Sequence, residues 1–234
     1  MEDLSSDHLI ERKDTKFISH ISKLHELLDL LPEDVVILTI NELNQFKYSS
    51  EYLDTEDLEL NLSHHNQRKN RMKVRIRHYV DTNNKFLEIK KKDNRGTTSK
   101  IRHYINGHDE SEFVDQHIQE LSTRLSDQLE KKLFTRFDRI TLVNKERTER
   151  LTIDRNLEFI ANTGVSIEYN NLVVFELKHE RNTRHSIFMG AMKKLKIRPK
   201  SFSKYCLGIS DLYDVKQNRF IQQRREITKI ENDA

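Results

Sequence analysis

The sequence predicts an α+β fold in which about eight antiparallel strands close into a β-barrel covered by several helices. Two observations lead to this fold class. Charged and apolar residues alternate along many short segments, as in RMKVRIRHYV from Arg71 to Val80, which is the period of a strand with one apolar face. Between these segments, apolar residues recur at helical spacing, so amphipathic helices are available to cover the apolar faces.

In the first half of the chain, apolar residues at helical spacing predict a helix over 20–31, which ends before Pro32. A β-branched run predicts a strand over 35–40, whereas 55–67 is left open as a short helix or a loop. The turns DTNN and DNRG separate the last three strands into a meander. The strands expected in this half are 11–17, 35–40, 46–53, 71–80, 85–92 and 97–105.

In the second half, the longest helix is expected over 109–132, where Asp109 and Glu112 resemble a capping box. The pair Asn170-Asn171 predicts a hairpin turn that leads into a strand over 172–179. Apolar spacing predicts a further helix, and a last helical stretch begins near Ser203. The remaining elements expected here are strands over 133–143 and 147–156 and the helix over 183–195.

The composition is that of a single folded domain spanning residues 1–234. Charged residues make up 34% of the chain, yet the net charge is only +3, which argues against a nucleic-acid coat protein. Cys206 is the only cysteine, so no intramolecular disulfide is expected and a reducing cytoplasm suits the chain. The stretch MEDLSSDHLIERKD has no apolar signal core, and no apolar run is long enough to span a membrane.

The charged residues of each strand share one face, and that face has two interpretations. Facing outward, they form an ordinary solvated surface. Facing inward in a barrel, they line a site for a polyanion with room for a metal ion. Two details favour the inward arrangement: several residues are Arg, whose guanidinium fork matches phosphate oxygens, and helices can bury the apolar faces from outside.

Short motifs along the chain carry a resemblance to a known family. In order, they are DTKF, YLDT, KVRIRHY, FLEIKKK, SKIR, FDRITL, ERLTID, FELK and FSKY. Each is unspecific alone, but together, from Glu11 to Gly208, they resemble the VTC domain. This is the polyphosphate polymerase domain of the triphosphate tunnel metalloenzymes, in the CYTH-like superfamily, and the chain is most similar to its bacterial branch. The resemblance implies an eight-stranded antiparallel tunnel in which basic side chains bind a triphosphate.

By this resemblance, the basic residues of the tunnel are those that match the family's strand motifs. The residues implied to bind the triphosphate are Arg75, Arg77, Lys90, Lys100 and Arg150, and the catalytic set adds Lys16, Arg139 and Lys204. The chain has one extra residue in KSFSK and a second arginine before FDR, so the places of Lys200 and Arg136 stay open.

Three acidic residues have expected roles beside these cations. By resemblance, Glu176 in FELK matches the glutamate that holds Mn²⁺ or Mg²⁺. Glu88 is left open between a second metal ligand and a salt-bridge partner inside the tunnel. Asp154 is expected to orient an arginine rather than to bind the metal.

The implied function is metal-dependent transfer of the γ-phosphate of ATP onto polyphosphate inside the basic tunnel. A triphosphate carries about four negative charges, and burying it requires nearly equal positive charge, which lysines, arginines and a divalent cation supply. Two alternatives stay open: hydrolysis of triphosphate or a nucleoside triphosphate, and polyphosphate binding without turnover. The expected partners are ATP, triphosphate or polyphosphate, with no nucleic acid, and a membrane protein stays open as a partner.

Overall fold

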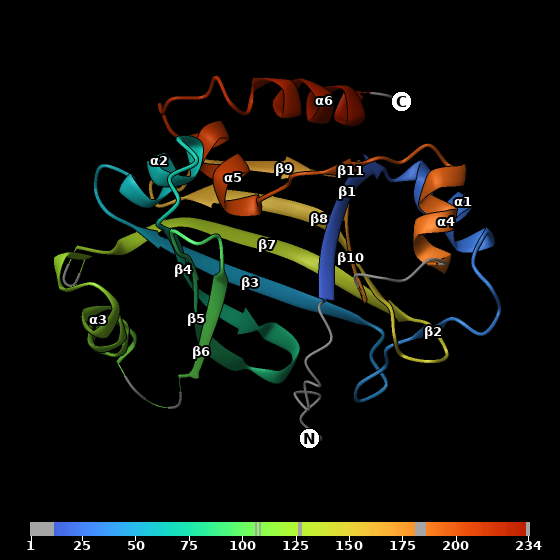
Figure 1. The fold of residues 1–234 in the computed structure, drawn as a ribbon, viewed down its shortest axis with the longest axis horizontal. Coiled ribbons are helices and arrows are strands. Elements are labelled where there is room, and N and C mark those ends of the chain that lie inside the picture. Colours follow the sequence, from blue (N-terminus) through green and yellow to red (C-terminus); the bar gives the residue numbers. More distant parts are fainter. Residues whose placement is uncertain (1–11, 106, 108, 126–127, 181–185, 233–234) are drawn as a thin grey trace.

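The computed structural model describes residues 12–105, 107, 109–125, 128–180 and 186–232, and one antiparallel sheet of eleven strands dominates them (Figure 1). The strands pair in the order β11-β1-β10-β8-β7-β3-β4-β5-β6, with β2 beside β7 and β9 beside β8. They are β1 (Arg12–His20), β2 (Val36–Ile37), β3 (Gln45–Asp54), β4 (Arg71–Tyr79), β5 (Asn84–Lys92), β6 (Thr98–Tyr104), β7 (Glu130–Val143), β8 (Arg150–Ala161), β9 (Ser166–Tyr169), β10 (Leu172–Glu180) and β11 (Pro199–Lys200).

The sheet is open, which corrects the predicted closed barrel of eight strands. Its edge strands within the described residues are β11 and β6, and these do not pair with each other. β11 has only two residues, and Pro199 lacks the amide hydrogen that a further ladder bond would need. The α+β class and the antiparallel pairing are confirmed, whereas closure by hydrogen bonds is wrong.

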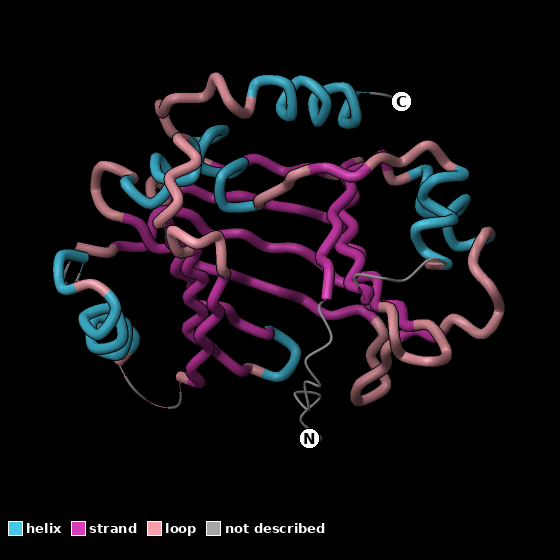
Figure 2. Tube along the Cα trace, viewed as in Figure 1, coloured by secondary structure: helices cyan, strands magenta, loops and turns pink. Residues whose placement is uncertain are grey.

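Six α-helices in the described part of the chain lie around the sheet (Figures 1 and 2). They are α1 (Ser22–Asp29), α2 (Glu59–His65), α3 (Glu110–Leu121), α4 (Ile187–Lys194), α5 (Lys204–Leu212) and α6 (Ile221–Asn232). Among the residues described, none of these helices combines the length and apolarity that a membrane crossing needs.

Helices bury the apolar faces of the strands from outside, as the amphipathic patterns predicted. α1 and α4 pack on β1, β8 and β10 in a core that includes Leu24, Phe175 and Phe188. α2 and α3 pack on β4 and β5 in a second core that includes Leu60 and Ile118. In Figure 1, α1 and α4 stand at the right beside β1 and β10, and α3 stands at the left beside β4–β6. The charged sides of these strands therefore face away from α1–α4.

The helix predicted over 109–132 is shorter in the structure. Asp109 caps it as predicted, accepting hydrogen bonds from the backbone of Ser111 and Glu112 at 3.0 Å. The helix ends at Leu121, because Ser122 is extended, with φ −166° and ψ 97°. A 3₁₀ turn follows, and β7 already begins at Glu130, because its alternating apolar residues are needed in the sheet.

The hairpin predicted at Asn170-Asn171 is also wrong. β9 and β10 do not pair with each other, because both pair with β8 and the two asparagines form a kink between them. The backbone amides of Asn170 and Asn171 donate to the carboxylate of Glu231 in α6, each at 3.1 Å. A helix distant in sequence therefore accepts the hydrogen bonds that these amides do not make within the sheet. Glu11 and Thr183, where a strand and a helix were predicted to begin, lie outside the described residues.

Gly208 of α5 packs tightly against the sheet. A β-carbon there would lie 2.7 Å from Leu133 Cδ2 and 3.2 Å from Phe159 Cγ. We expect Gly208→Ala to lower the free energy of unfolding by about 1–3 kcal/mol, because overpacking displaces side chains and backbone. Gly190→Ala in α4 is the matched control, since nothing lies within 4 Å of its β-carbon position and Ala favours a helix. Chemical denaturation measures both, and equal stabilities would contradict the tight packing of α5.

Candidate functional site

The side of the sheet that faces away from α1–α4, here called the inner face, carries alternate charged residues of several strands. On β4, Val74 and Ile76 are buried in the core beneath α2 and α3, and Arg75 and Arg77 point to the opposite side. The same alternation places the charged residues of the neighbouring strands beside them. The charged residues of the inner face include Lys16 of β1, Arg75 and Arg77 of β4, Glu88 and Lys90 of β5, Lys100 of β6, Arg139 of β7, Asp154 of β8, and Glu176 and Lys178 of β10.

One end of the inner face is apolar and is filled by α5. Phe137 and Val174 pack there with Tyr205 in a core separate from the two beneath the outer helices. The first turn of α5 reaches the charged part of the face. Lys73 Nζ donates a hydrogen bond to Oγ of Ser203, the residue that caps α5, at 2.9 Å. Lys204, the first residue of α5, therefore joins a cluster built otherwise from strands.

Asp154 holds two of the predicted cations in place. Arg139 donates from Nε to Oδ1 at 2.6 Å and from Nη2 to Oδ2 at 2.8 Å, and Lys204 pairs with the same carboxylate. Burial alone would raise the pKa of Asp154, but the charges of Arg139 and Lys204 lower it to about 2. The geometry matches the expectation that Asp154 orients an arginine.

Glu88 is the centre of a second group of cations. Arg75 donates to Glu88 Oε2 from Nε at 2.8 Å and from Nη2 at 2.5 Å. Arg77, Lys100 and Arg102 lie between 3.6 and 3.9 Å from the carboxylate. Burial would raise the pKa of Glu88, but these cations, Arg75 first, lower it to about 2. Glu88 is only 4% exposed, so this environment favours an anchor for arginine over a second metal ligand.

Arg77 uses fewer of its hydrogen-bond donors than Arg75 does. Arg75 also donates from Nη1 to the hydroxyl of Tyr52 at 3.0 Å, so all sides of its guanidinium are occupied. Arg77 makes one long bond, from Nε to Ser50 Oγ at 3.4 Å, and its Nη1 is 3.9 Å from Glu88. Burial and the neighbouring charge of Arg75 lower the pKa of Arg77. Arg77 is therefore a buried cation with spare donors.

Lysines from the two ends of the sheet influence each other across the inner face. Burial lowers the pKa of Lys90 on β5, and the next contributions come from Lys73 and from Lys16 on β1. Burial likewise lowers the pKa of Lys100 on β6, with a further contribution from Lys178 on β10. No backbone ladder joins β5 and β6 to β1 and β10, and the lysines that these strands carry on the inner face, only some of which have a carboxylate partner, make the face attractive to an anion.

Glu176 lies among lysines that are long and flexible. It pairs with Lys16, and Lys178 Nζ lies 3.4 Å from its Oε1. Burial would raise the pKa of Glu176, but the charges of Lys16 and Lys178 lower it well below the usual range. The carboxylate is therefore ionised, and its side chain is 23% exposed.

A divalent cation fits this site only together with a phosphate ligand. The described residues contain no group of three or more His, Cys, Asp or Glu side chains that could hold a metal ion. Glu176 offers one ionised carboxylate whose partners can move aside. Mg²⁺ in phosphoryl-transfer sites is often held by one or two carboxylates, water and the substrate phosphates. Glu176 therefore suits such a cation, which would arrive with its phosphate.

Of the three remaining predicted or open positions, Arg150 and Lys200 lie at the margin of the inner face and Arg136 lies away from it. Arg150 is exposed at the start of β8, opposite Lys178 in the register, and so shares the face of Asp154. Lys200 Nζ pairs with Glu226 of α6 at 2.9 Å. Arg136 is 62% exposed and pairs with Glu158 at 3.2 Å, so Arg139 is the arginine of FDR that reaches the cluster.

The predicted set omitted three cations that belong to the inner face. Lys73, Arg102 and Lys178 have the same strand parity as Arg75, Lys100 and Glu176, respectively. The alternation that identified their neighbours therefore also contained the signal for them. The alternation in the sequence does not give the strand register, and the register is what shows how far along each strand the cluster extends.

The buried carboxylates make the free energy of unfolding depend on pH in the acidic range. A carboxylate with a lowered folded pKa stabilises the protein above its unfolded pKa, near 4, and that contribution is lost as the pH falls towards 2. We expect Asp154→Asn to lower the free energy of unfolding by about 3–5 kcal/mol at pH 7, because Arg139 and Lys204 lose their partner. The difference from wild type should shrink between about pH 4 and pH 2.

Chemical denaturation at several pH values measures this effect. Glu26→Gln is the control, because Glu26 forms an exposed pair with Lys23 on α1, and such pairs contribute little. A difference between wild type and Asp154→Asn that stays constant from pH 7 to pH 2 would contradict the buried ion pairs.

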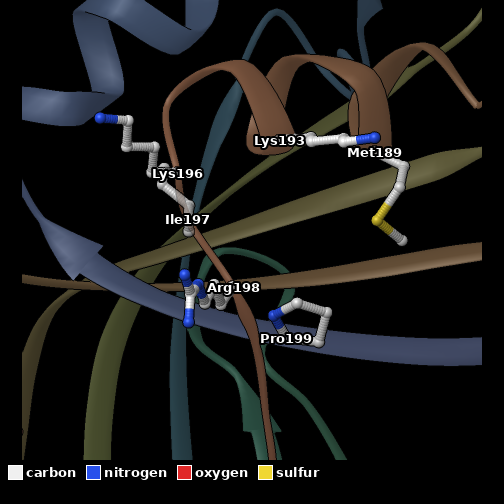
Figure 3. Close-up of a pocket in the computed structure, with 6 residues that line it drawn as sticks. All are labelled: Met189, Lys193, Lys196, Ile197, Arg198 and Pro199. Carbon is white, nitrogen blue, oxygen red and sulfur yellow. The ribbon is translucent and has the colours of Figure 1, made fainter.

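A separate pocket of about 370 Å³ lies outside the inner face (Figure 3). Pro199 pairs with Phe17 of β1, whose side chain is buried in the core beneath α1 and α4. The pocket therefore opens on the outer side, and none of the predicted site residues lines it. Its lining comprises Met189, Lys193, Lys196, Ile197, Arg198 and Pro199.

Solved structures share this fold at low sequence identity. A "putative adenylyl cyclase" from Hippeastrum, described with a dominant triphosphatase activity, is 16% identical and superposes with a TM-score of 0.54 over 86% of this chain and 96% of that one. A "putative adenylate cyclase" from Bacillus halodurans is 14% identical, with a TM-score of 0.50 over 87% of this chain and 99% of that one. At such identities the likeness concerns the fold alone. No curated protein matches the sequence.

The sequence itself identifies the family. The model of the VTC domain matches residues 11–213, which is most of the chain and includes every strand of the inner face. The match covers the motifs from DTKF to FSKY that carried the resemblance. The chain therefore belongs to the VTC domain family.

Proposed function

We propose that this protein is a metal-dependent phosphotransferase that moves the γ-phosphate of ATP onto a polyphosphate chain along the inner face. The observation that carries the proposal is the state of the cations there. Asp154 and Glu88 hold Arg139, Lys204 and Arg75 in fixed positions. Arg77 keeps spare donors, and Lys90 of the neighbouring strand adds positive charge, for phosphate oxygens.

The chemistry suits such a surface. Phosphoryl transfer needs an in-line arrangement of acceptor and leaving oxygens and stabilisation of charge on the moving phosphoryl group. Arginines held by carboxylates provide fixed donors that need no reorganisation during the reaction. A divalent cation, Mn²⁺ or Mg²⁺, would be held by Glu176 together with phosphate oxygens and would neutralise charge on them. Membership in the VTC family supports polyphosphate as the acceptor.

Hydrolysis of a triphosphate is a second candidate. The structure from Hippeastrum that shares this fold is described with a dominant triphosphatase activity, which supports it. Water and a terminal phosphate oxygen can occupy the same in-line position, so the same cations serve either acceptor. The two functions differ only in the group that receives the phosphoryl group.

The products distinguish these functions. We expect incubation with ATP and Mn²⁺ or Mg²⁺ to yield ADP and a lengthening polyphosphate in matching amounts, with little orthophosphate. A chelator should stop the reaction. Release of orthophosphate in amounts equal to ADP would show that the protein is a hydrolase and would contradict the polymerase proposal. Tight triphosphate binding without any product would leave a binding module and overturn both enzymatic proposals.

A further inference from the structure

The motif YLDT, from Tyr52 to Thr55, contributes no cation to the phosphate site, yet its aspartate is fully buried. Asp54 ends β3 and is 0% exposed. Its carboxylate accepts hydrogen bonds from the backbone amides of Thr55 and Leu60, each at 2.8 Å, and of Asn61 at 3.0 Å. These bonds fix the carboxylate against the start of α2.

A fourth donor to Asp54 comes from α5. The hydroxyl of Tyr205 donates to Asp54 Oδ2. Tyr205 is 2% exposed and directly follows Lys204 in the first turn of this helix. Burial and the charge of Asp54 raise the pKa of the Tyr205 phenol well above its usual value, so the phenol keeps the hydrogen that it donates. The bond therefore ties the first turn of α5 to the end of β3.

The residues on both sides of Lys204 are anchored. The Tyr205 ring stacks on Tyr52 of the same YLDT motif, with ring centroids 5.1 Å apart. Ser203, which caps α5, accepts a hydrogen bond from Lys73 Nζ at 2.9 Å. The backbone of Lys204 is thus held from both directions, because its two neighbours in sequence have fixed partners.

The side chain of Lys204 depends on such an anchor. It is 12% exposed and pairs with the carboxylate of Asp154, which also holds Arg139. A lysine is a point charge on a flexible stem, and fixing its ammonium costs side-chain entropy. The location of that charge beside a phosphate oxygen therefore depends on where the helix backbone begins. A misplacement of about 1 Å that is caused by a distant residue can lower a rate about a hundredfold.

We propose that Asp54 and Tyr205 are positioning residues: the bond from the Tyr205 hydroxyl to the Asp54 carboxylate sets the place of the Lys204 ammonium in the phosphate site. The inference rests on the proposed function, in which Lys204 is one of the cations that meet phosphate oxygens. It gives YLDT a role in phosphate binding that acts through α5. It also gives a reason for the tyrosine that directly follows the lysine of FSKY.

Tyr205→Phe tests the bond, because it removes only the hydroxyl and keeps the stacked ring. Tyr169→Phe is the matched control: Tyr169 of β9 donates the same kind of bond, at 2.5 Å, to Asp211 at the other end of α5. We expect both variants to unfold at lower denaturant concentration than wild type. In calorimetry without metal, only Tyr205→Phe should weaken tripolyphosphate binding, by about tenfold.

A double-mutant cycle with Lys204→Met shows whether the effect passes through the lysine. In the Lys204→Met background, Tyr205→Phe should change tripolyphosphate affinity by less than about twofold, because the group that it positions is gone. A general loosening of the fold would instead weaken binding equally in both backgrounds.

The outcomes separate this inference from the proposed function. The positioning role is overturned, and the phosphate site stands, if Tyr205→Phe or Lys204→Met binds tripolyphosphate as wild type does. Equal losses in the two backgrounds, or in Tyr205→Phe and Tyr169→Phe, overturn it as well. If the wild-type protein does not bind tripolyphosphate, the proposed function fails, and the positioning role fails with it.

Discussion

Arg77→Ala is expected to lower the affinity for inorganic tripolyphosphate by about a hundredfold, the loss that corresponds to about 3 kcal/mol of charge-assisted hydrogen bonding. Arg77 is 9% exposed, and its Nη1 reaches Glu88 only at 3.9 Å. Burial and the charges of Arg75 and Arg139 lower its pKa, which means that the surroundings disfavour the cation. An incoming phosphate oxygen can accept from the donors that this guanidinium does not use in its one long bond to Ser50.

Arg75→Ala should affect the free energy of unfolding more and the affinity for tripolyphosphate less than Arg77→Ala does. Arg75 already donates to Glu88 and to Tyr52, so it has fewer donors for a ligand. Its removal leaves Glu88 buried without its closest partner, which should lower the free energy of unfolding by about 3–5 kcal/mol. Arg77→Ala should cost much less stability, because relief of repulsion among Arg75, Arg77 and Arg139 offsets the lost packing.

Calorimetry with tripolyphosphate and chemical denaturation measure the two quantities separately. Arg136→Ala is the matched control, since Arg136 is 62% exposed and its pair with Glu158 lies away from the inner face. That variant should match wild type in both measurements. Normal tripolyphosphate affinity in Arg77→Ala would remove Arg77 from the phosphate site.

The side on which each strand carries its charges was predictable from the sequence. On β4 and β10, charged residues such as Arg75 and Glu176 alternate with apolar ones such as Val74 and Leu177, and the structure keeps that alternation. The reason is local, since successive side chains of a strand point to opposite faces. The helices that cover the apolar sides were predictable for the same reason, because their apolar stripes follow helical spacing.

The partners within the site depend on contacts between distant segments, which no local pattern encodes. Asp154 was expected to orient an arginine, but only the register of β7 with β8 identifies Arg139. That register shifts between Arg136 and Asp138, opposite Asn156, whose φ of 54° is the left-handed conformation that asparagine tolerates. Lys204 reaches Asp154 from a helix fifty residues later in the chain.

Local sequence patterns also could not predict that the sheet is open. The number of strands in a closed barrel depends on tilt and stagger, which follow from the pairing of all strands together. A local pattern finds a strand such as β4 but does not say whether β6 meets β11. Here the short β11 ends the sheet, and no backbone ladder joins it to β6 among the described residues.

Glu176→Gln is expected to lower metal-dependent turnover of ATP by about two orders of magnitude or more, because several kcal/mol of transition-state charge stabilisation depend on the cation. The substitution keeps the size of the side chain and removes the charge that attracts the metal. Lys16 then loses its carboxylate partner and Lys178 keeps only Asp14, at 3.5 Å, so both lysines are freer to bind phosphate oxygens. Affinity for tripolyphosphate without metal should therefore stay the same or increase.

These opposite effects separate metal binding from phosphate binding at one residue. Calorimetry with tripolyphosphate in the presence of a chelator measures phosphate binding, and Mn²⁺-dependent consumption of ATP measures the metal-dependent reaction. Glu158→Gln is the control, because Glu158 pairs with the exposed Arg136 and should affect neither. A Glu176→Gln protein that turns over ATP like wild type would remove Glu176 from the metal site. Weaker tripolyphosphate binding in that variant would instead mean that Glu176 positions Lys16 and Lys178 for phosphate. A carboxylate whose only role is to bind the metal repels phosphate when the metal is absent, so its removal should not weaken phosphate binding.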